Sequence, residues 1–164
     1  MRNGALGCLP WPRMGECDMA TPKELRANIT DARASFLEAL HEAHYKWETK
    51  PQGTADGEAA WSPKEVAGHV AGAEWFFTNS ISVACGAPEV ARPSFDASTP
   101  AKTAGTITRN AAKFDDVIRH VSDGDLAKPV GDKFPVPNAS VGDALGVWAS
   151  HLNDHANQLR AACS

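Results

Sequence analysis

The chain contains 164 residues, of which 43% are hydrophobic and 22% are charged, and its formal net charge is −4. This length suits a single domain, and the composition is typical of a soluble globular protein, which excludes disorder over most of the chain. The slight excess of acidic residues argues against a large cationic surface, and therefore against nucleic-acid binding as the main activity. Because no run of 18 apolar residues is present, we expect no membrane-spanning helix.

Residues 1–19 show no helical periodicity, and glycines and prolines interrupt their apolar part, which is too short for a secretory signal. We therefore expect a flexible N-terminal tail over 1–19, one folded domain over 20–164, and a cytoplasmic location. The cysteines form no Cys-x-x-Cys pair and are too sparse for a disulfide framework, so we expect reduced thiols at Cys8, Cys17, Cys85 and Cys163.

Four helix starts follow in chain order, and they share one pattern. Each has a hydroxyl residue that can cap the first turn, followed by proline at the first helical position, by an acidic residue at the third, or by both. Trp61, just before the second start, can also pack against Val66 as a hydrophobic staple. The four predicted starts are Thr21-Pro22-Lys23-Glu24, Ser62-Pro63-Lys64-Glu65, Thr99-Pro100-Ala101-Lys102 and Ser140-Val141-Gly142-Asp143.

Apolar residues after each start recur every three or four positions, which predicts four amphipathic helices. The stripes run from Leu25 to Trp47, from Val66 to Ile81, from Ile107 to Val121 and from Val141 to Ala162. No segment alternates as a strand would. We therefore predict an all-α fold, a four-helix bundle with long connecting loops near 50–60, 86–98 and 122–139. Loops of this length favour one or two crossover connections, or a lid over a site.

Two histidines interrupt the last apolar stripe. His151 and His155 are four residues apart, so their side chains lie one turn apart on the same helix face. Both are expected to point into the bundle, where unpaired imidazoles would lose solvation. A His-x-x-x-His pair on one face can bind zinc, nickel or copper, which would remove that cost.

His69 is the candidate third ligand, because it lies on the buried side of the helix that starts at Ser62. Its distance from the start of that helix matches the distance of His155 from the end of the last helix, so antiparallel packing would place them level. The alternative is that these are core histidines bonded to backbone carbonyls. His41 and His44 lie beside glutamates on what we expect to be a solvated face, and we do not expect them to be ligands.

Two motifs support a family resemblance. Residues 61–77, which include His69 and, five positions later, Glu74, resemble the second helix of the DinB/YfiT-like superfamily, with its Trp-Ser/Thr-Pro start. Residues 151–159 resemble the closing His-x-x-x-His-x-x-Gln helix of that superfamily, with Asn157 where glycine is common. The resemblance covers about residues 20–162, although only these two motifs are specific.

The resemblance implies a four-helix metalloprotein that binds a divalent ion, zinc or nickel, through His69, His151 and His155. The superfamily includes bacillithiol S-transferases and mycothiol-dependent maleylpyruvate isomerases. Three protein ligands leave a position open for an exogenous ligand. We therefore expect a metal-dependent transferase or related enzyme that uses a low-molecular-weight thiol as cosubstrate and acts on a small-molecule substrate. The alternative is a non-catalytic metal-binding protein that acts in stress response or binds a partner.

Other residues suggest secondary roles. Carboxylates at Asp154, Glu65 and Glu74 are candidates to accept a hydrogen bond from a ligand imidazole, but for each of them we expect a helix cap or a surface pair instead. Residues 122–139 could cover the site. A homodimer through an exposed apolar helix face is also expected. Aromatic residues near the histidines are expected to belong to the core rather than to stack on a cofactor; they are Trp75, Phe76, Phe77 and Trp148.

Overall fold

The computed structural model describes residues 20–52 and 56–163, and these fold into four α-helices with no strand among them. The expected tail over 1–19 lies outside the described residues. The prediction of an all-α four-helix bundle is confirmed. The helices are α1 (Pro22–Glu42), α2 (Pro63–Ala84), α3 (Pro100–Ile118) and α4 (Val141–Cys163), with short 3₁₀ turns η1 (Ala43–Lys46), η2 (Glu58–Ala60) and η3 (Asp123–Asp125).

Each helix begins where its capping sequence predicts. The side chains of Thr21 and Ser62 accept hydrogen bonds from the third backbone N–H of α1 and α2, and the glutamate at that position bonds back to the cap. Thr99 caps α3 through its hydroxyl, and Ser140 exchanges hydrogen bonds with Asp143 at the start of α4. These bonds satisfy backbone donors that the first turn of a helix leaves unpaired.

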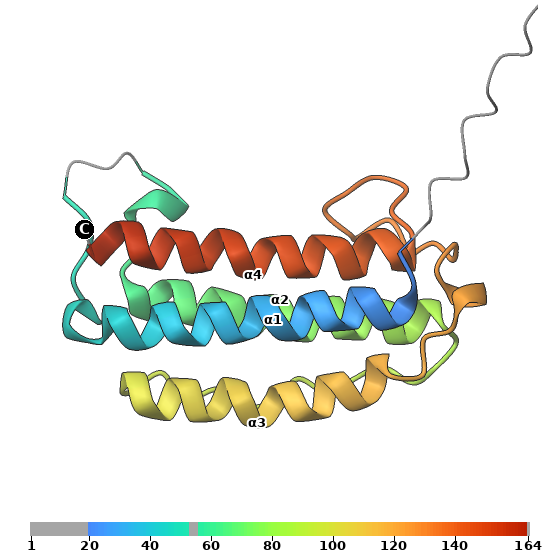
Figure 1. Cartoon of the computed structure of the whole chain (residues 1–164), viewed down its shortest axis with the longest axis horizontal. Coiled ribbons are helices and arrows are strands. Elements are labelled where there is room, and N and C mark those ends of the chain that lie inside the picture. Colours follow the sequence, from blue (N-terminus) through green and yellow to red (C-terminus); the bar gives the residue numbers. More distant parts are fainter. Residues whose placement is uncertain (1–19, 53–55, 164) are drawn as a thin grey trace, which may run out of the picture.

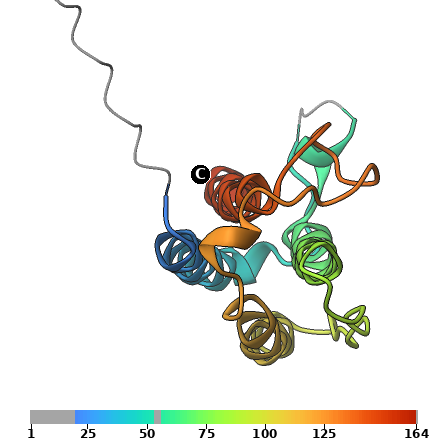
Figure 2. The same ribbon diagram turned by 90° about the vertical axis from the view of Figure 1, so that its right-hand side faces the viewer.

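The helices lie roughly parallel in a bundle, with α4 packed against α1 and α2, and α3 on the opposite side (Figures 1 and 2). The colours of Figure 1 show that α1 and α4 run in one direction and that α2 and α3 run in the other. The antiparallel packing of α2 and α4 is the arrangement that brings their histidines level. The core contains fully buried side chains from every helix, including Phe36, Ile81, Ile107, Trp148 and Leu152.

The segment 85–99 is a crossover that returns along the bundle from the end of α2 to the start of α3 (Figure 1). Side chains of α2 hold it in place: the Trp75 indole N–H donates to the Val90 carbonyl at 2.8 Å, and the Val90 N–H donates to Asn79 Oδ1 at 2.8 Å. The segment 122–139 joins α3 to α4, and its Phe134 is buried against the Phe76 and Phe77 rings of α2.

Two predicted helix ends are wrong. The apolar stripe that we extended to Trp47 leaves the α-helix at Glu42 and continues as η1, and Val121 lies beyond the end of α3 at Ile118. Trp47 and Val121 are nevertheless buried. A 3₁₀ turn also brings residues three apart onto one face, so a short apolar repeat cannot distinguish it from an α-helix. Within the part of the chain that the structure describes, no helix is long and apolar enough to cross a membrane.

Candidate metal centre

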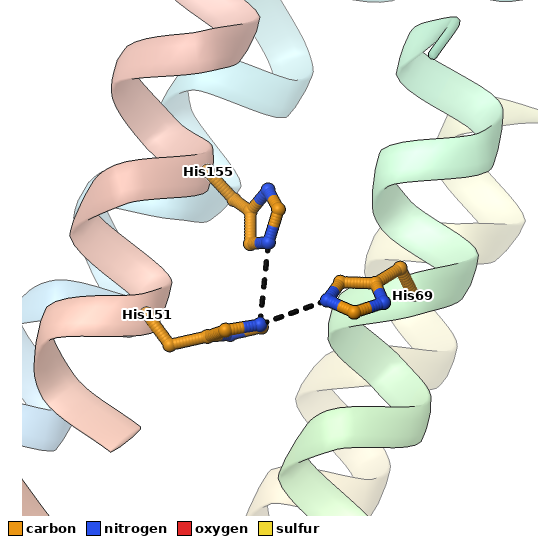
Figure 3. Close-up of side chains that lie close together, drawn as sticks. All are labelled: His69, His151 and His155. Carbon is orange, nitrogen blue, oxygen red and sulfur yellow. Dashed lines mark hydrogen bonds between the residues drawn. The ribbon is translucent and has the colours of Figure 1, made fainter. Parts of the chain in front are cut away.

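His69 projects from α2 toward α4, where His151 and His155 project back, and the three rings meet between the two helices (Figure 3). The Nε2 atom of His151 lies 2.9 Å from that of His69 and 3.2 Å from that of His155. Each residue offers a ring nitrogen within 4.8 Å of the other two. The structure therefore brings together the three histidines that the sequence singled out.

Two of the three nitrogen separations are close to what one ion requires. Nitrogen ligands at about 2.05 Å from a tetrahedral ion would lie about 3.3 Å apart. The two Nε2 separations from His151 are within a few tenths of an ångström of this value. Within residues 20–52 and 56–163, this is the one group of His, Cys, Asp or Glu side chains so arranged.

Gln158 fixes the proton on His155. The amide nitrogen of Gln158 donates to the backbone carbonyl of Glu58, so its oxygen faces the imidazole, and His155 Nδ1 lies 2.7 Å from that oxygen. An amide oxygen only accepts, so Nδ1 carries the proton and Nε2 keeps a lone pair. A metal-ligating histidine commonly has this arrangement, with its second nitrogen bonded to an oxygen acceptor.

The hydrogen-bonding capacity of His151 Nε2 is also informative. This atom faces ring nitrogens on both His69 and His155, yet it can carry only one proton or one lone pair. A proton there can serve one neighbour well and leaves the other poorly satisfied. Three nitrogens that each direct a lone pair to a shared cation have no such conflict, so this donor set fits a metal ion.

Burial favours the neutral form of His69 and His151. Loss of solvation, together with the neighbouring His155 and His69 rings, lowers the pKa of His151 to about 4. Desolvation and then His155 lower the pKa of His69 as well, partly opposed by Glu58. Since a protonated imidazole cannot bind a metal, these shifts leave His69 and His151 available as ligands at neutral pH.

Aromatic side chains surround the histidines. The Trp61 ring, just before α2, has its centroid 4.9 Å from that of His69 and stacks on His155 at 6.4 Å. The Phe77 ring meets His151 edge to face at 5.6 Å and stacks on Trp148 at 6.0 Å. Phe77 and Trp148 are core residues, as expected, and they restrict the directions in which the His151 ring can turn.

A cleft of about 520 Å³ opens over His69 and His151. Figure 2 shows η2 and the loop 122–139 on the same side of the bundle, beside the junction between α2 and α4, and Figure 1 shows them toward opposite ends of α4. Pro135 of that loop lines the cleft, which supports the expectation that the loop covers part of the site. The other lining residues include Trp75, Phe76, Gly72, Ala73, Glu58 and Arg92.

The carboxylates suggested as partners of the ligand imidazoles make no such contact. Glu65 bonds to Ser62 and Lys50 as part of the helix cap, and Glu74 is buried in an ion pair with Arg33. Asp154 is exposed, and no bond joins it to a ligand histidine. The partner found instead is Gln158, whose signal was its position three residues after His155 on the same helix.

The remaining histidines lie outside the group. His44 is exposed, and its Nδ1 is bonded to the His41 carbonyl at 2.7 Å, in agreement with the expected solvated face.

Arg92 lines the cleft, but its sequence context did not predict this, because it lies in an irregular loop outside both histidine motifs.

A comparison with known families gives one match, in which the profile of the DinB superfamily covers residues 24–159. No curated protein and no solved structure matched the chain. The match spans most of the sequence, including all three histidines and all but the extremities of the bundle. The chain therefore belongs to the DinB superfamily.

Proposed function

We propose that the protein is a metal-dependent enzyme, a transferase or a related enzyme, that joins a low-molecular-weight thiol to a small-molecule electrophile. Zinc or nickel would be held by His69, His151 and His155. The observation that carries the proposal is the convergence of three ring nitrogens beneath an open cleft, with Gln158 holding one ring in the ligand tautomer.

The open cleft favours catalysis over a purely structural ion. Structural metal sites are usually closed by four protein ligands, whereas catalytic sites keep a position for water or substrate. The described residues supply three donors here, and the cleft reaches two of them, His69 and His151. When bound, the cation would lower the pKa of a thiol at the remaining position and so favour the nucleophilic thiolate.

The chain itself would position and shield the reactants. The amide of Gln158 holds His155 in one orientation, and the Phe77 and Trp61 rings limit rotation of the other two imidazoles. Phe76 and Pro135 line the cleft with apolar side chains. Where a bound ligand displaces water from such walls, electrostatic interactions with the thiol are stronger and an electrophile is protected from hydrolysis.

The cellular setting follows from the same chemistry. Low-molecular-weight thiols are abundant in reducing compartments, and Cys85 and Cys163 are both free thiols in the structure. We therefore propose a cytoplasmic location.

The test is a conjugation assay with monobromobimane as electrophile and bacillithiol, mycothiol, cysteine or coenzyme A as thiol. Untagged protein would be compared after loading with Zn²⁺ or Ni²⁺ and after chelation. We expect conjugation by the loaded protein with at least one thiol, and its loss on chelation and in His151→Ala. The matched control is His44→Ala, which removes an exposed imidazole outside the group and should retain the activity.

Two outcomes would contradict the proposal. If the loaded protein binds metal through the three histidines but conjugates no thiol above the uncatalysed rate, the non-catalytic metal-binding protein becomes the better account. If His151→Ala conjugates as fast as the original protein, the reaction does not use this site.

A further inference from the structure

We propose that the cleft binds a ligand that carries a carboxylate, and that Arg92 is the residue that recognises it. The ligand's apolar body would lie against Phe76 and Pro135, with its reacting end toward the histidines. The orientation of the ligand's reacting end toward the histidines rests on the proposed function. The substrate class that we infer is an apolar molecule with one anionic group.

Arg92 is held over the cleft by a fixed segment of chain. The guanidinium carbon lies 5.2 Å from the centroid of the Trp75 ring, in a cation–π contact, and the Trp75 indole bonds to Val90 two residues earlier. On the other side, Asn110 of α3 donates to the Ser94 carbonyl at 3.3 Å. Anchors on both sides reduce the ordering cost that binding a ligand would otherwise incur.

The guanidinium has no polar partner of its own. Among residues 20–52 and 56–163, Arg92 is the one arginine for which neither a hydrogen bond nor an ion pair is found. A planar guanidinium can bind a carboxylate through two parallel hydrogen bonds, and its ability to do so is unused here. A positive charge that is positioned but not neutralised is suited to an anionic ligand.

The Arg92 guanidinium lies near the part of the cleft that contains the histidines. A Cβ atom built on Gly72 would lie 3.7 Å from Arg92 Nη2, so the guanidinium lies against α2 where that helix has no side chain. Gly72 follows His69 by three residues, a rise of about 4.5 Å along the helix. A ligand of modest size can therefore contact Arg92 and the histidine group together.

The cleft is lined by residues of opposite charge, Glu58 and Arg92, and His69 lines the same cleft. An anion is thus repelled from the Glu58 side and attracted to the Arg92 side. This polarity fixes which end of a carboxylate-bearing ligand points to Arg92.

The experiment compares 3-phenylpropionate with 3-phenyl-1-propanol, which has the same apolar body without the charge. Binding to the original protein, Arg92→Gln and Arg109→Gln would be measured by calorimetry, before and after metal removal. Arg109 is the matched control, because it is an exposed arginine whose bond, at 3.5 Å, is to the Gly105 carbonyl of its own helix. The side-chain Nε–H resonance of Arg92 would be followed in parallel.

We expect the carboxylate to bind about tenfold more tightly than the alcohol, and Arg92→Gln to remove this preference while leaving the alcohol unchanged. Arg109→Gln should keep the preference, and the Arg92 Nε–H resonance should shift with the carboxylate alone. The preference should survive metal removal, so it can hold even if no metal-dependent reaction is found.

The inference is overturned if acid and alcohol bind equally, if neither binds, or if Arg92→Gln keeps the preference. A preference that disappears on metal removal but persists in Arg92→Gln would mean that the carboxylate binds the metal. That result would refute the role of Arg92 and leave the proposed function standing.

Discussion

The orientation of the His155 imidazole depends on the side-chain amide of Gln158. Gln158 receives the His155 Nδ1–H and is itself held by the Glu58 carbonyl, so a backbone group of η2 fixes a ring on α4. The residues packed around His155 leave only 5% of its surface exposed. The ligand tautomer is therefore set before any metal binds.

We expect Gln158→Ala to weaken metal binding about 10- to 100-fold, the usual cost of removing a hydrogen-bond partner of a ligand histidine. Without the amide, the His155 proton can move to Nε2, and the ring loses its fixed orientation. Competitive titration with a chromophoric chelator measures this affinity. The control is Asn157→Ala, an exposed neighbour on α4; equal affinities of the two variants would show that the amide does not support the site.

Individual residues differ in how far the sequence predicted them. His69, His151 and His155 could be found because helical spacing places each on an inward face. Gln158 could have been found from its spacing to His155, whereas the carboxylates that we considered are used elsewhere, Glu65 in the helix cap that we expected as its other role and Glu74 in a buried ion pair. Arg92 carries no local signal, since its position depends on long-range bonds between the crossover and α2.

Helix starts were predictable for a physical reason that does not extend to helix ends. A capping box is satisfied within four residues, so it can be recognised without knowledge of the rest of the fold. The end of α1 depends instead on packing, because Ala43 and Trp47 are buried although the chain has left the α-helix at Glu42. Sequence spacing therefore identified the helices and their starts but misplaced two of their ends.

Ser62→Ala should reduce the free energy of unfolding by about 1 kcal/mol, because it removes the cap of α2 and its reciprocal bonds with Glu65. Urea unfolding of the metal-free protein measures the change. Thr108→Ala is the control: it removes an exposed hydroxyl that bonds only to the Ala104 carbonyl, and a change within about 0.5 kcal/mol is expected. A loss at Ser62 no larger than this would mean that the cap does not stabilise α2.

At the level of the whole molecule, one buried arginine of α1 contacts the other three helices. Arg33 of α1 donates to Glu74 of α2 at 2.7 Å and to Asp115 of α3 at 3.1 Å, and its guanidinium lies 5.7 Å from the Trp148 ring of α4. Arg33 and Glu74 are 5% and 1% exposed, so each charge depends on the other for compensation. The Arg33–Glu74 ion pair therefore joins α1 to α2, although these two helices lie diagonally opposite each other in the bundle.

Glu74→Leu alone should cost about 3 to 5 kcal/mol of unfolding free energy, because it leaves the Arg33 charge buried without its main partner. The double variant Arg33→Met/Glu74→Leu should recover much of this loss, since an apolar pair needs no compensation. Chemical unfolding measures both, with Lys64→Met in the exposed Lys64–Glu48 pair as a control expected to cost less than about 1 kcal/mol. A double variant no more stable than the single one would contradict this account.

The architecture followed from pattern, but its connectivity did not. Four amphipathic stripes with capped starts leave a helical bundle as the natural way to bury their apolar faces. The sequence could not show whether 85–99 or 122–139 is the crossover. The hydrogen bonds that hold 85–99 in place, such as the one from Trp75 of α2 to Val90, join residues that are not neighbours in the sequence. The expected homodimer stays a prediction.

We propose that His69, His151 and His155 bind one divalent ion. Elemental analysis of untagged protein after equilibration with Zn²⁺ and dialysis tests this, for the original chain, each single His→Ala variant of the three, and His44→Ala. We predict an equimolar amount of metal in the original chain and in His44→Ala, and far less in each of the three variants. An original chain without metal, or three variants that all retain it, would contradict the claim.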